Sequence, residues 1–144
     1  SFCIHGSAEH LAAVAPIIAR FPAVRVALDH QGGVPATGDE GGRLLGEVVG
    51  LARHTNVYIK LSPQPHRSSQ PYPHRDTFGL YRRLLEAYGP RRAMWGTNFP
   101  GVLRQTGYAQ ALALFQRHLD GVSDEDRRWL LGGTAADLYR LAAP

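Results

Sequence analysis

The sequence has almost no cysteine, a single lysine and no long apolar run. Cys3 is the only cysteine among the 144 residues, so an intramolecular disulfide and a cysteine cluster for zinc are both excluded. No apolar stretch approaches the roughly 20 residues that a membrane-spanning helix needs, so no membrane segment is predicted. The first residues also lack the basic and then apolar pattern of a secretory signal. Together these absences favour a cytoplasmic protein.

Positive charge is carried almost entirely by arginine. Lys60 is the single lysine among 16 basic residues, and the formal net charge is +4 with a pI near 9.6. Arginine binds phosphate and carboxylate groups, so one interpretation is anion or nucleic-acid binding. The arginines are scattered in short pairs, however, which is typical of a solvated surface. No nucleic-acid partner is predicted, and neither glycine-rich phosphate-loop pattern occurs.

Apolar and amphipathic segments alternate along the chain. Short apolar segments predict strands at 1–5, 24–30, 56–62 and 93–98, and helical spacing predicts helices at 7–21, 42–54, 77–89 and 108–119. Two more helices are predicted near the C-terminus, and the predicted helix caps are Ser7, Asp76, Ser123 and Thr134. This alternation indicates a parallel sheet covered by helices, in one domain that spans 1–144. An open doubly wound sheet and part of a (β/α)8 barrel both fit.

Each predicted strand ends in polar residues. The four ends carry His5, Asp29-His30, Ser62 and Thr97-Asn98. In parallel α/β folds the carboxyl ends of the strands converge on one crevice, where active-site groups lie. Imidazoles from neighbouring ends can bind one divalent cation, and a carboxylate from a further strand can act as the base for a metal-bound water. The alternative is that each histidine is an ordinary hydrogen-bonded loop residue.

Five segments of the sequence resemble a known family. In chain order they are "VRVALDHQGG", "NVYIKLS", "YPHRD", "GPRRAMWGTNFPGV" and "LLGGTAADLY". They are similar to the C-terminal part of the amidohydrolase-related metal-dependent hydrolases, TIM-barrel proteins that include 2-pyrone-4,6-dicarboxylate lactonase-like and aminocarboxymuconate-semialdehyde-decarboxylase-like enzymes. The resemblance covers nearly the whole chain. It implies an α/β fold that forms the C-terminal half of a (β/α)8 TIM barrel, with four parallel strands, their helices and extra C-terminal helices.

The resemblance also implies a metal-dependent hydrolase. His5 and His30 then fall on the fifth and sixth barrel strands as ligands of a divalent ion, zinc or manganese, and His30 and Asn98 are the predicted catalytic residues. The predicted reaction is hydrolysis of a lactone or amide bond in a small, carboxylated molecule. Because four strand–helix units make half a barrel, we expect a missing N-terminal half-barrel or a homo-oligomer. The chain also begins without methionine, so we expect further residues upstream.

Four residues near the predicted barrel mouth are predicted to bind the substrate: Lys60, Ser62, His74 and Arg75. An ammonium and a guanidinium in that place would favour an acidic small molecule. The alternative is that Lys60 extends along the strand rim into solvent and that the arginine is solvated.

The sequence departs from the family pattern at two points. No His-x-His motif occurs, and Asn98 stands where relatives commonly place an aspartate. A neutral amide cannot take a proton from water near neutral pH, and losing a general base typically lowers the rate by about 10²–10⁴-fold. The alternative prediction is therefore a degenerate, non-catalytic barrel protein that binds a small acid. A third prediction, an unrelated α/β domain that binds a nucleotide, lacks support from any phosphate-loop pattern.

Overall fold

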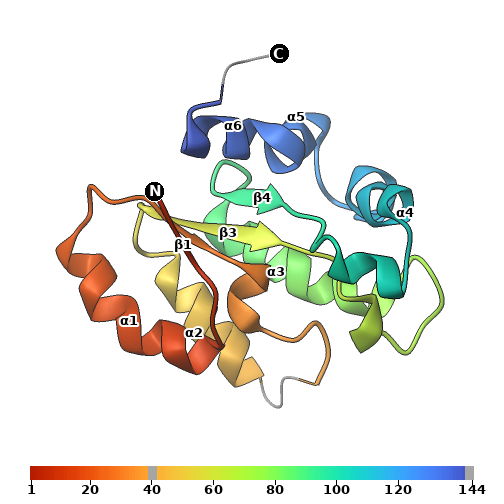
Figure 1. Cartoon of the computed structure of the whole chain (residues 1–144), viewed down its shortest axis with the longest axis horizontal. Coiled ribbons are helices and arrows are strands. Elements are labelled where there is room, and N and C mark those ends of the chain that lie inside the picture. Colours follow the sequence, from red (N-terminus) through yellow and green to blue (C-terminus); the bar gives the residue numbers. More distant parts are fainter. Residues whose placement is uncertain (39–41, 142–144) are drawn as a thin grey trace.

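The fold is built on one parallel sheet. A computed structural model describes residues 1–38 and 42–141 of the chain. The strands lie in sequence order: β1 (Phe2–Ile4), β2 (Val26–Leu28), β3 (Val57–Leu61) and β4 (Ala93–Trp95). All three neighbouring pairs are parallel, with Cys3 opposite Ala27 and Ala27 opposite Tyr58. The prediction of four parallel strands is confirmed, and Figure 1 shows the sheet at the centre of the molecule.

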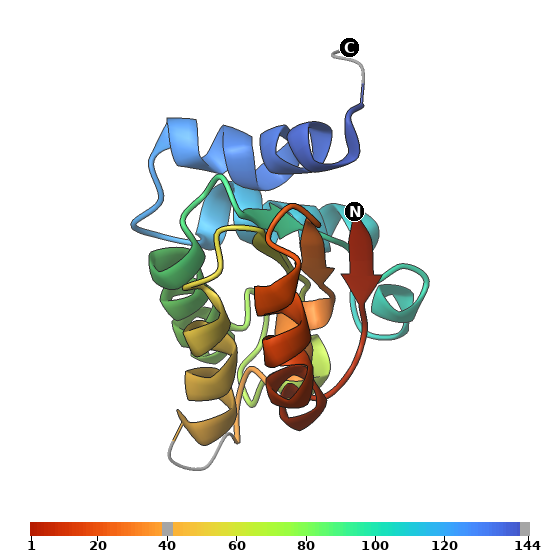
Figure 2. The same ribbon diagram turned by 90° about the vertical axis from the view of Figure 1, so that its left-hand side faces the viewer.

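Three helices cover one face of this sheet. They are α1 (Ala8–Arg20), α2 (Arg43–Leu51) and α3 (Phe78–Tyr88), and Figures 1 and 2 show them as one layer. The strand residues that face them are buried: Val26, Leu28, Val57, Ile59 and Leu61. Most of the buried core lies between these strands and the three helices. Each buried aliphatic side chain stabilises the fold by roughly 1.5–3 kcal/mol. No helix in the described part of the chain is long and apolar enough to cross a membrane.

The opposite face of the sheet, here the inner face, is covered only in part. Its residues include Cys3, Ala27, Tyr58, Lys60 and Met94. Leu138 of α6 (Thr134–Tyr139) packs in a small cluster with Ala27, Tyr58 and Met94. Asp137 in the same helix accepts a hydrogen bond from Arg25 at 3.2 Å, which ties α6 to the residue before β2. The inner face is therefore closed near the strand starts.

The C-terminal region adds further helices, as predicted. α4 (Tyr108–Ala113) and α5 (Asp124–Arg128) are extended by the π-helical turns Leu114–His118 and Trp129–Gly133. Because the second turn runs directly into α6, helical geometry is nearly continuous from Asp124 to Tyr139.

Two of the four predicted helix caps are confirmed. The Ser7 hydroxyl accepts a hydrogen bond from the His10 amide at 3.5 Å, and the Ser123 hydroxyl accepts one from the Asp126 amide at 3.1 Å. A side-chain oxygen in this position satisfies one of the free amides of the first helical turn.

The other two predicted caps are wrong. Thr134 does not precede its helix, because the chain is already helical there, and its hydroxyl donates to the Pro90 carbonyl at 2.7 Å. Asp76 lies in a 3₁₀ turn before α3, and its carboxylate accepts hydrogen bonds from Ser68 and Ser69 instead. The Asp76 carboxylate therefore closes the loop that precedes α3.

Some arginines act within the fold rather than as a free basic surface. The Arg92 guanidinium donates to the carbonyls of Ala52, His54 and Val57 at 3.0, 3.0 and 3.3 Å. The Arg127 guanidinium likewise donates to the carbonyls of Phe115, Leu119 and Val122, in the segment after α4. The Ala52 carbonyl lies at the C-terminal end of α2, where carbonyls lack helical partners, so the Arg92 guanidinium supplies one there.

Both outer strands leave an open edge. Within residues 1–38 and 42–141, β1 pairs only with β2, and β4 pairs only with β3. Phe2 on β1 is 66% exposed, and an apolar groove of about 430 Å³ runs between β1 and α1. Open edges with exposed apolar side chains favour pairing with further chain. The architecture is that of half a (β/α)8 barrel.

Candidate active site

The loops that follow the four strands meet around one pocket at the carboxyl edge of the sheet. The pocket has a volume of about 240 Å³ and is lined by His5, His30, Gln31, Ser62, Pro63, Gln64, His66 and Asn98. We refer to it as the strand-end pocket. It brings together four of the residues predicted from the sequence, one from each strand end: His5, His30, Ser62 and Asn98. Their chemical roles stay predictions.

The loop after β2 holds its residues in the left-handed region of φ and ψ. The φ angle is 51° at His30 and 59° at Gln31, and it stays positive at Gly32 and Gly33. Such a conformation is unfavourable by of order 1–3 kcal/mol for each residue that has a Cβ, and it is concentrated at functional sites. The surrounding contacts must therefore hold His30 and Gln31 in place.

Gly33 lets this loop approach the loop after β1. A Cβ at Gly33 would fall on the carbonyl oxygen of Gly6 and lie only 2.9 Å from the Cα of Ser7. A side chain at position 33 would therefore push the two loops apart. Because the loop after β1 begins at His5, this close approach sets His5 beside His30.

His30 contacts two other residues of the strand-end pocket. Its Nδ1 is 3.0 Å from the Ser62 hydroxyl oxygen, and its ring meets the His5 ring edge to face with centroids 5.3 Å apart. Burial lowers the pKa of His30; the Asp29 carboxylate opposes this shift, while His5 and Lys60 lower the pKa further. His30 is therefore neutral near neutral pH, with a ring nitrogen available as a base or a ligand.

The Ser62 carbonyl accepts hydrogen bonds from two buried side chains at the pocket. The buried Gln31 side chain donates to this carbonyl through Nε2, and the Tyr81 hydroxyl donates to it at 3.1 Å. Burial raises the pKa of Tyr81 to about 12, so its hydroxyl keeps its proton. Sequence reasoning missed Gln31 and Gln64 as pocket residues. For Gln31 the available signal was a polar side chain directly after His30 inside a glycine-rich turn.

Asn98 is exposed at the rim of the pocket. Its φ angle is 58°, in the left-handed region where asparagine and aspartate are better tolerated than most residues. Its side-chain amide lies against Gly101, where an added Cβ would be 3.5 Å from the amide nitrogen. The backbone would accept an aspartate equally well, so nothing in the local conformation explains why the residue is an amide.

Lys60 lies outside the strand-end pocket, on the inner face. Its Nζ is 2.7 Å from Asp29 Oδ1 and 3.3 Å from Cys3 Sγ, and it lies 5.6 Å from the Tyr139 ring centroid. Burial lowers the pKa of Lys60, but hydrogen bonds to Asp29, Tyr139 and Cys3 outweigh this effect and raise the pKa above its ordinary range. The ammonium is therefore charged and paired within the chain.

His74 and Arg75 also lie outside this pocket. His74 Nδ1 is 2.9 Å from the Gln70 carbonyl oxygen, and its ring meets the Tyr72 ring edge to face. Arg75 forms an exposed ion pair with Asp120 at 3.1 Å. Of the four predicted substrate-binding residues, the structure places Ser62 in the pocket and the other three elsewhere. Their contact with a substrate stays a prediction.

The donor groups fit part of a metal site. His5 and His30 present two imidazoles to one pocket, and the Ser62 hydroxyl orients the second ring, as outer-shell partners of metal ligands do. Among residues 1–38 and 42–141, no group of three or more His, Cys, Asp or Glu side chains could hold a metal ion. A zinc site in an enzyme uses about three protein ligands. Two histidines alone fall short of that number, so these residues could supply only part of a coordination shell.

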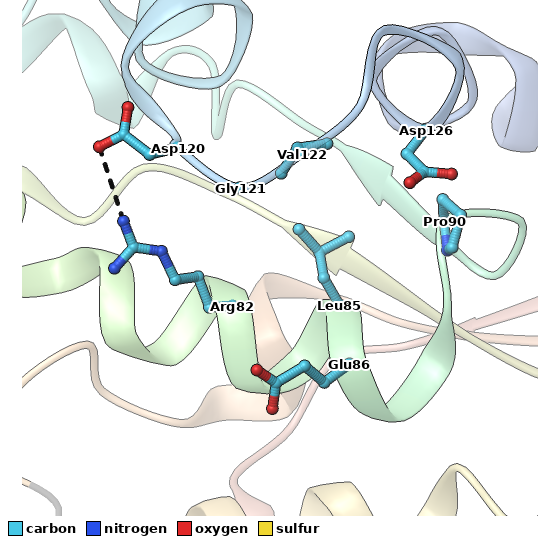
Figure 3. A pocket seen from close by; sticks show the side chains of 8 residues that line it. All are labelled: Arg82, Leu85, Glu86, Pro90, Asp120, Gly121, Val122 and Asp126. Carbon is cyan, nitrogen blue, oxygen red and sulfur yellow. Dashed lines mark ion pairs between the residues drawn. The ribbon is translucent and has the colours of Figure 1, made fainter.

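A second cavity lies on the helical surface and lacks such convergence. It has a volume of about 340 Å³, between α3 and the segment 120–126. Figure 3 shows Arg82 directed toward Asp120, with which it pairs at 3.7 Å, whereas Glu86 and Asp126 lie apart from that pair. Because its acidic groups diverge, this cavity does not resemble an active site.

Comparisons with known proteins agree with the fold. The model of one family, described as amidohydrolase, matches residues 1–141. The chain is 29% identical to L-fucono-1,5-lactonase from Burkholderia ambifaria, over 94% of this chain and 48% of that protein. Among solved structures it is similar to an amidohydrolase from Burkholderia multivorans with bound zinc, with a TM-score of 0.85 and 26% identity, over 97% of this chain and 52% of that one.

A more distant structure supports the fold alone. The chain is similar to a Pseudomonas putida protein named as a candidate 2-pyrone-4,6-dicarboxylic acid hydrolase. The TM-score is 0.79 and the identity 21%, over 99% of this chain and 52% of that one. The chain therefore spans about half the length of the relatives it matches.

Proposed function

Because the chain belongs to the amidohydrolase family, we propose that it supplies half of an active site that hydrolyses a lactone or amide bond in a small molecule. The observation that carries this proposal is the strand-end pocket, where His5, His30 and Asn98 meet from three different strand ends. A catalytic pocket at the carboxyl ends of barrel strands is the general rule for this fold.

His30 is the residue we assign to proton transfer or metal binding. Its ring is held by Ser62, and its pKa is lowered by burial, so the neutral imidazole is available near neutral pH. Together with His5 it would hold part of the coordination shell of a zinc or manganese ion, which would polarise the substrate carbonyl and acidify a water when bound. The remaining ligands would come from outside the described residues.

Asn98 is assigned to orientation rather than to proton transfer. Its amide can accept and donate hydrogen bonds at the rim of the pocket, and it can position a water or the substrate carbonyl. An amide cannot act as a general base, so His30 or a group outside this chain must take the proton from water.

The second half of the active site is proposed to lie in further chain. The open edges of β1 and β4, the apolar groove beside β1 and the partly covered inner face would all be covered by an N-terminal half-barrel or by a second copy. Residues 1–144 would form a single structural unit of that assembly. A cytoplasmic location and a carboxylated substrate stay predictions from the sequence.

Hydrolysis of lactones and amides tests this function. A lactone releases one proton near neutral pH, whereas an amide releases a carboxylate and a protonated amine, so amide hydrolysis is followed by the free amine. Hydrolysis by the polypeptide that carries this chain, followed at constant pH, should fall by about 10²-fold or more in His30→Ala. His10→Ala is the matched control, because His10 is exposed on α1 outside the pocket and should leave the rate unchanged. Unchanged hydrolysis in His30→Ala would contradict the proposal.

The second candidate function is binding of a small molecule without turnover. Asn98 in place of the usual aspartate, and the incomplete set of metal ligands, favour it. Ligand binding without hydrolysis, together with hydrolysis that appears in Asn98→Asp, would support this alternative over the first. Hydrolysis by the unchanged chain would exclude it.

A further inference from the structure

Gln31 leaves one half of its side-chain amide without a partner. The residue is fully buried at the strand-end pocket, and its Nε2 donates to the Ser62 carbonyl oxygen. Its Oε1 is buried and has no hydrogen-bond partner among the described residues. A buried polar atom without a partner is strongly unfavourable, so such an atom in a native fold calls for a water or a bound molecule.

The neighbouring Gln64 shows what a purely structural glutamine looks like in this pocket. Its Oε1 accepts a hydrogen bond from the Ala36 amide at 2.7 Å, and its Nε2 donates to the Val34 carbonyl at 3.2 Å. Gln31 cannot reach the same state by exchanging its amide oxygen and nitrogen, because that would set its oxygen against the Ser62 carbonyl oxygen. The free group in the pocket is thus an acceptor.

The described lining of the strand-end pocket contains no Lys, Arg, Asp or Glu side chain. Two of the residues predicted to bind an acidic substrate are engaged elsewhere: Lys60 pairs with Asp29 at 2.7 Å, and Arg75 pairs with Asp120 at 3.1 Å. Within this lining a carboxylate would meet no side chain of fixed positive charge. Imidazole, amide and hydroxyl groups are well suited to an uncharged ligand that offers hydrogen-bond donors.

We infer that Gln31 is a specificity-determining residue whose amide oxygen accepts a hydrogen bond from a hydroxyl group on an uncharged part of the substrate. The nature of the cleaved bond rests on the proposed function, whereas the binding preference does not. The oxygen is buried, so side chains of the lining would have to adjust around a bound hydroxyl group, and such side-chain changes are common on binding. A carboxylate has no proton to donate and would meet an acceptor there.

Two ring compounds that cannot be hydrolysed test this preference. Anhydroglucitol carries several hydroxyl groups and no charge, and tetrahydropyran carboxylate carries a carboxylate and no hydroxyl. Their dissociation constants are measured by calorimetry on the polypeptide that carries this chain, and then on Gln31→Met and Tyr81→Phe. Tyr81→Phe is the comparison variant: it removes the hydroxyl that donates to the Ser62 carbonyl and also contacts the Gln31 side chain, and it retains the Gln31 amide itself.

Anhydroglucitol is expected to bind more tightly than the carboxylate. Gln31→Met should weaken its binding by about 10-fold, whereas Tyr81→Phe should leave the ratio of the two constants within about twofold. Tighter binding of the carboxylate, or no binding of either compound, would overturn the inference. An unchanged constant in Gln31→Met would also overturn it, and would assign the oxygen to a buried water.

The comparison of the two compounds needs no variant, so it stays decisive even if Gln31→Met does not fold. It is also independent of catalysis. Gln31-dependent binding of anhydroglucitol by a protein that hydrolyses neither lactones nor amides would contradict the proposed function and leave this inference standing. Lactone hydrolysis by a protein with no preference between the two compounds would do the opposite.

Discussion

Two polar pairs join the end of β2 to β3, and their surroundings differ. Asp29 and Lys60 meet at 2.7 Å on the inner face, and the ammonium also contacts Cys3 and lies over the Tyr139 ring. His30 and Ser62 meet at 3.0 Å in the strand-end pocket, beside a second histidine ring. The first pair satisfies its charges within the chain, whereas the second keeps a ring nitrogen available. The difference separates a pair that is satisfied within the chain from a pair that leaves a group open to further contacts, although the two are neighbours in sequence.

The largest effect on stability is expected at Gly33, where the loop after β2 approaches the loop after β1. Gly33→Ala would place a Cβ on the Gly6 carbonyl oxygen at a φ of 75°, so the free energy of unfolding should fall by about 2–4 kcal/mol. Gly38→Ala is the matched control, because Gly38 has a φ of 80° but nothing within 4 Å of the added Cβ. Urea unfolding of both variants separates steric overlap from backbone strain. Equal losses would show that the close approach of the loops contributes nothing.

The next largest effect on stability is expected at the Asp29–Lys60 ion pair. Lys60→Met leaves the half-buried Asp29 carboxylate without its partner and should lower the free energy of unfolding by about 1–3 kcal/mol. Arg83→Met breaks an ion pair with Glu86 whose side chains are 63% and 65% exposed, and it should change the stability by less than about 0.5 kcal/mol. Thermal or urea unfolding measures both. A loss no larger in Lys60→Met than in Arg83→Met would contradict the structural role of the pair.

A smaller effect on stability is expected from pH, through the titration of His30. Because burial lowers the pKa of His30 below its ordinary value of 6.5, the unfolded chain binds a proton at a higher pH than the folded chain. The contribution of His30 to stability is therefore complete above the unfolded value and decreases as the pH falls through the interval below it. Urea unfolding at about pH 8 and about pH 5 should show a smaller loss in His30→Gln than in the unchanged chain. An equal loss in both would place this titration elsewhere.

The smallest effect on stability is expected at Asn98. Aspartate tolerates the left-handed conformation about as well as asparagine does, and the side chain is exposed, so Asn98→Asp should change the free energy of unfolding by less than about 0.5 kcal/mol. Any change in hydrolysis by this variant then reports on chemistry rather than on folding. A loss above about 1 kcal/mol would show that the amide has a structural role.

The architecture follows from sequence patterns because those patterns depend on burial. Val57, Ile59 and Leu61 alternate with Lys60, so the buried side of β3 and the opposite orientation of Lys60 can both be predicted. The meeting of His5, His30, Ser62 and Asn98 follows from the geometry of parallel strands, whose carboxyl ends share one edge.

The remaining features depend on contacts that local sequence does not encode. Asp76 has the residue type and position of a helix cap, yet Ser68 and Ser69 provide better partners once the loop folds back. The ion pair that engages Lys60 depends on the direction in which Asp29 leaves β2, and the role of Gln31 depends on a turn with successive positive φ angles. Such long-range choices of partner require the three-dimensional structure.

The most direct test of the distinction between the two pairs compares His30→Ala with Lys60→Met in the polypeptide that carries this chain. For each variant, kcat/KM for a lactone and the free energy of unfolding are measured together. His30→Ala should lower kcat/KM by about 10²-fold or more, while Lys60→Met should lower stability and leave kcat/KM within about threefold. A large loss of kcat/KM in Lys60→Met at full stability, with hydrolysis unchanged in His30→Ala, would contradict the assignment of the strand-end pocket as the reactive side.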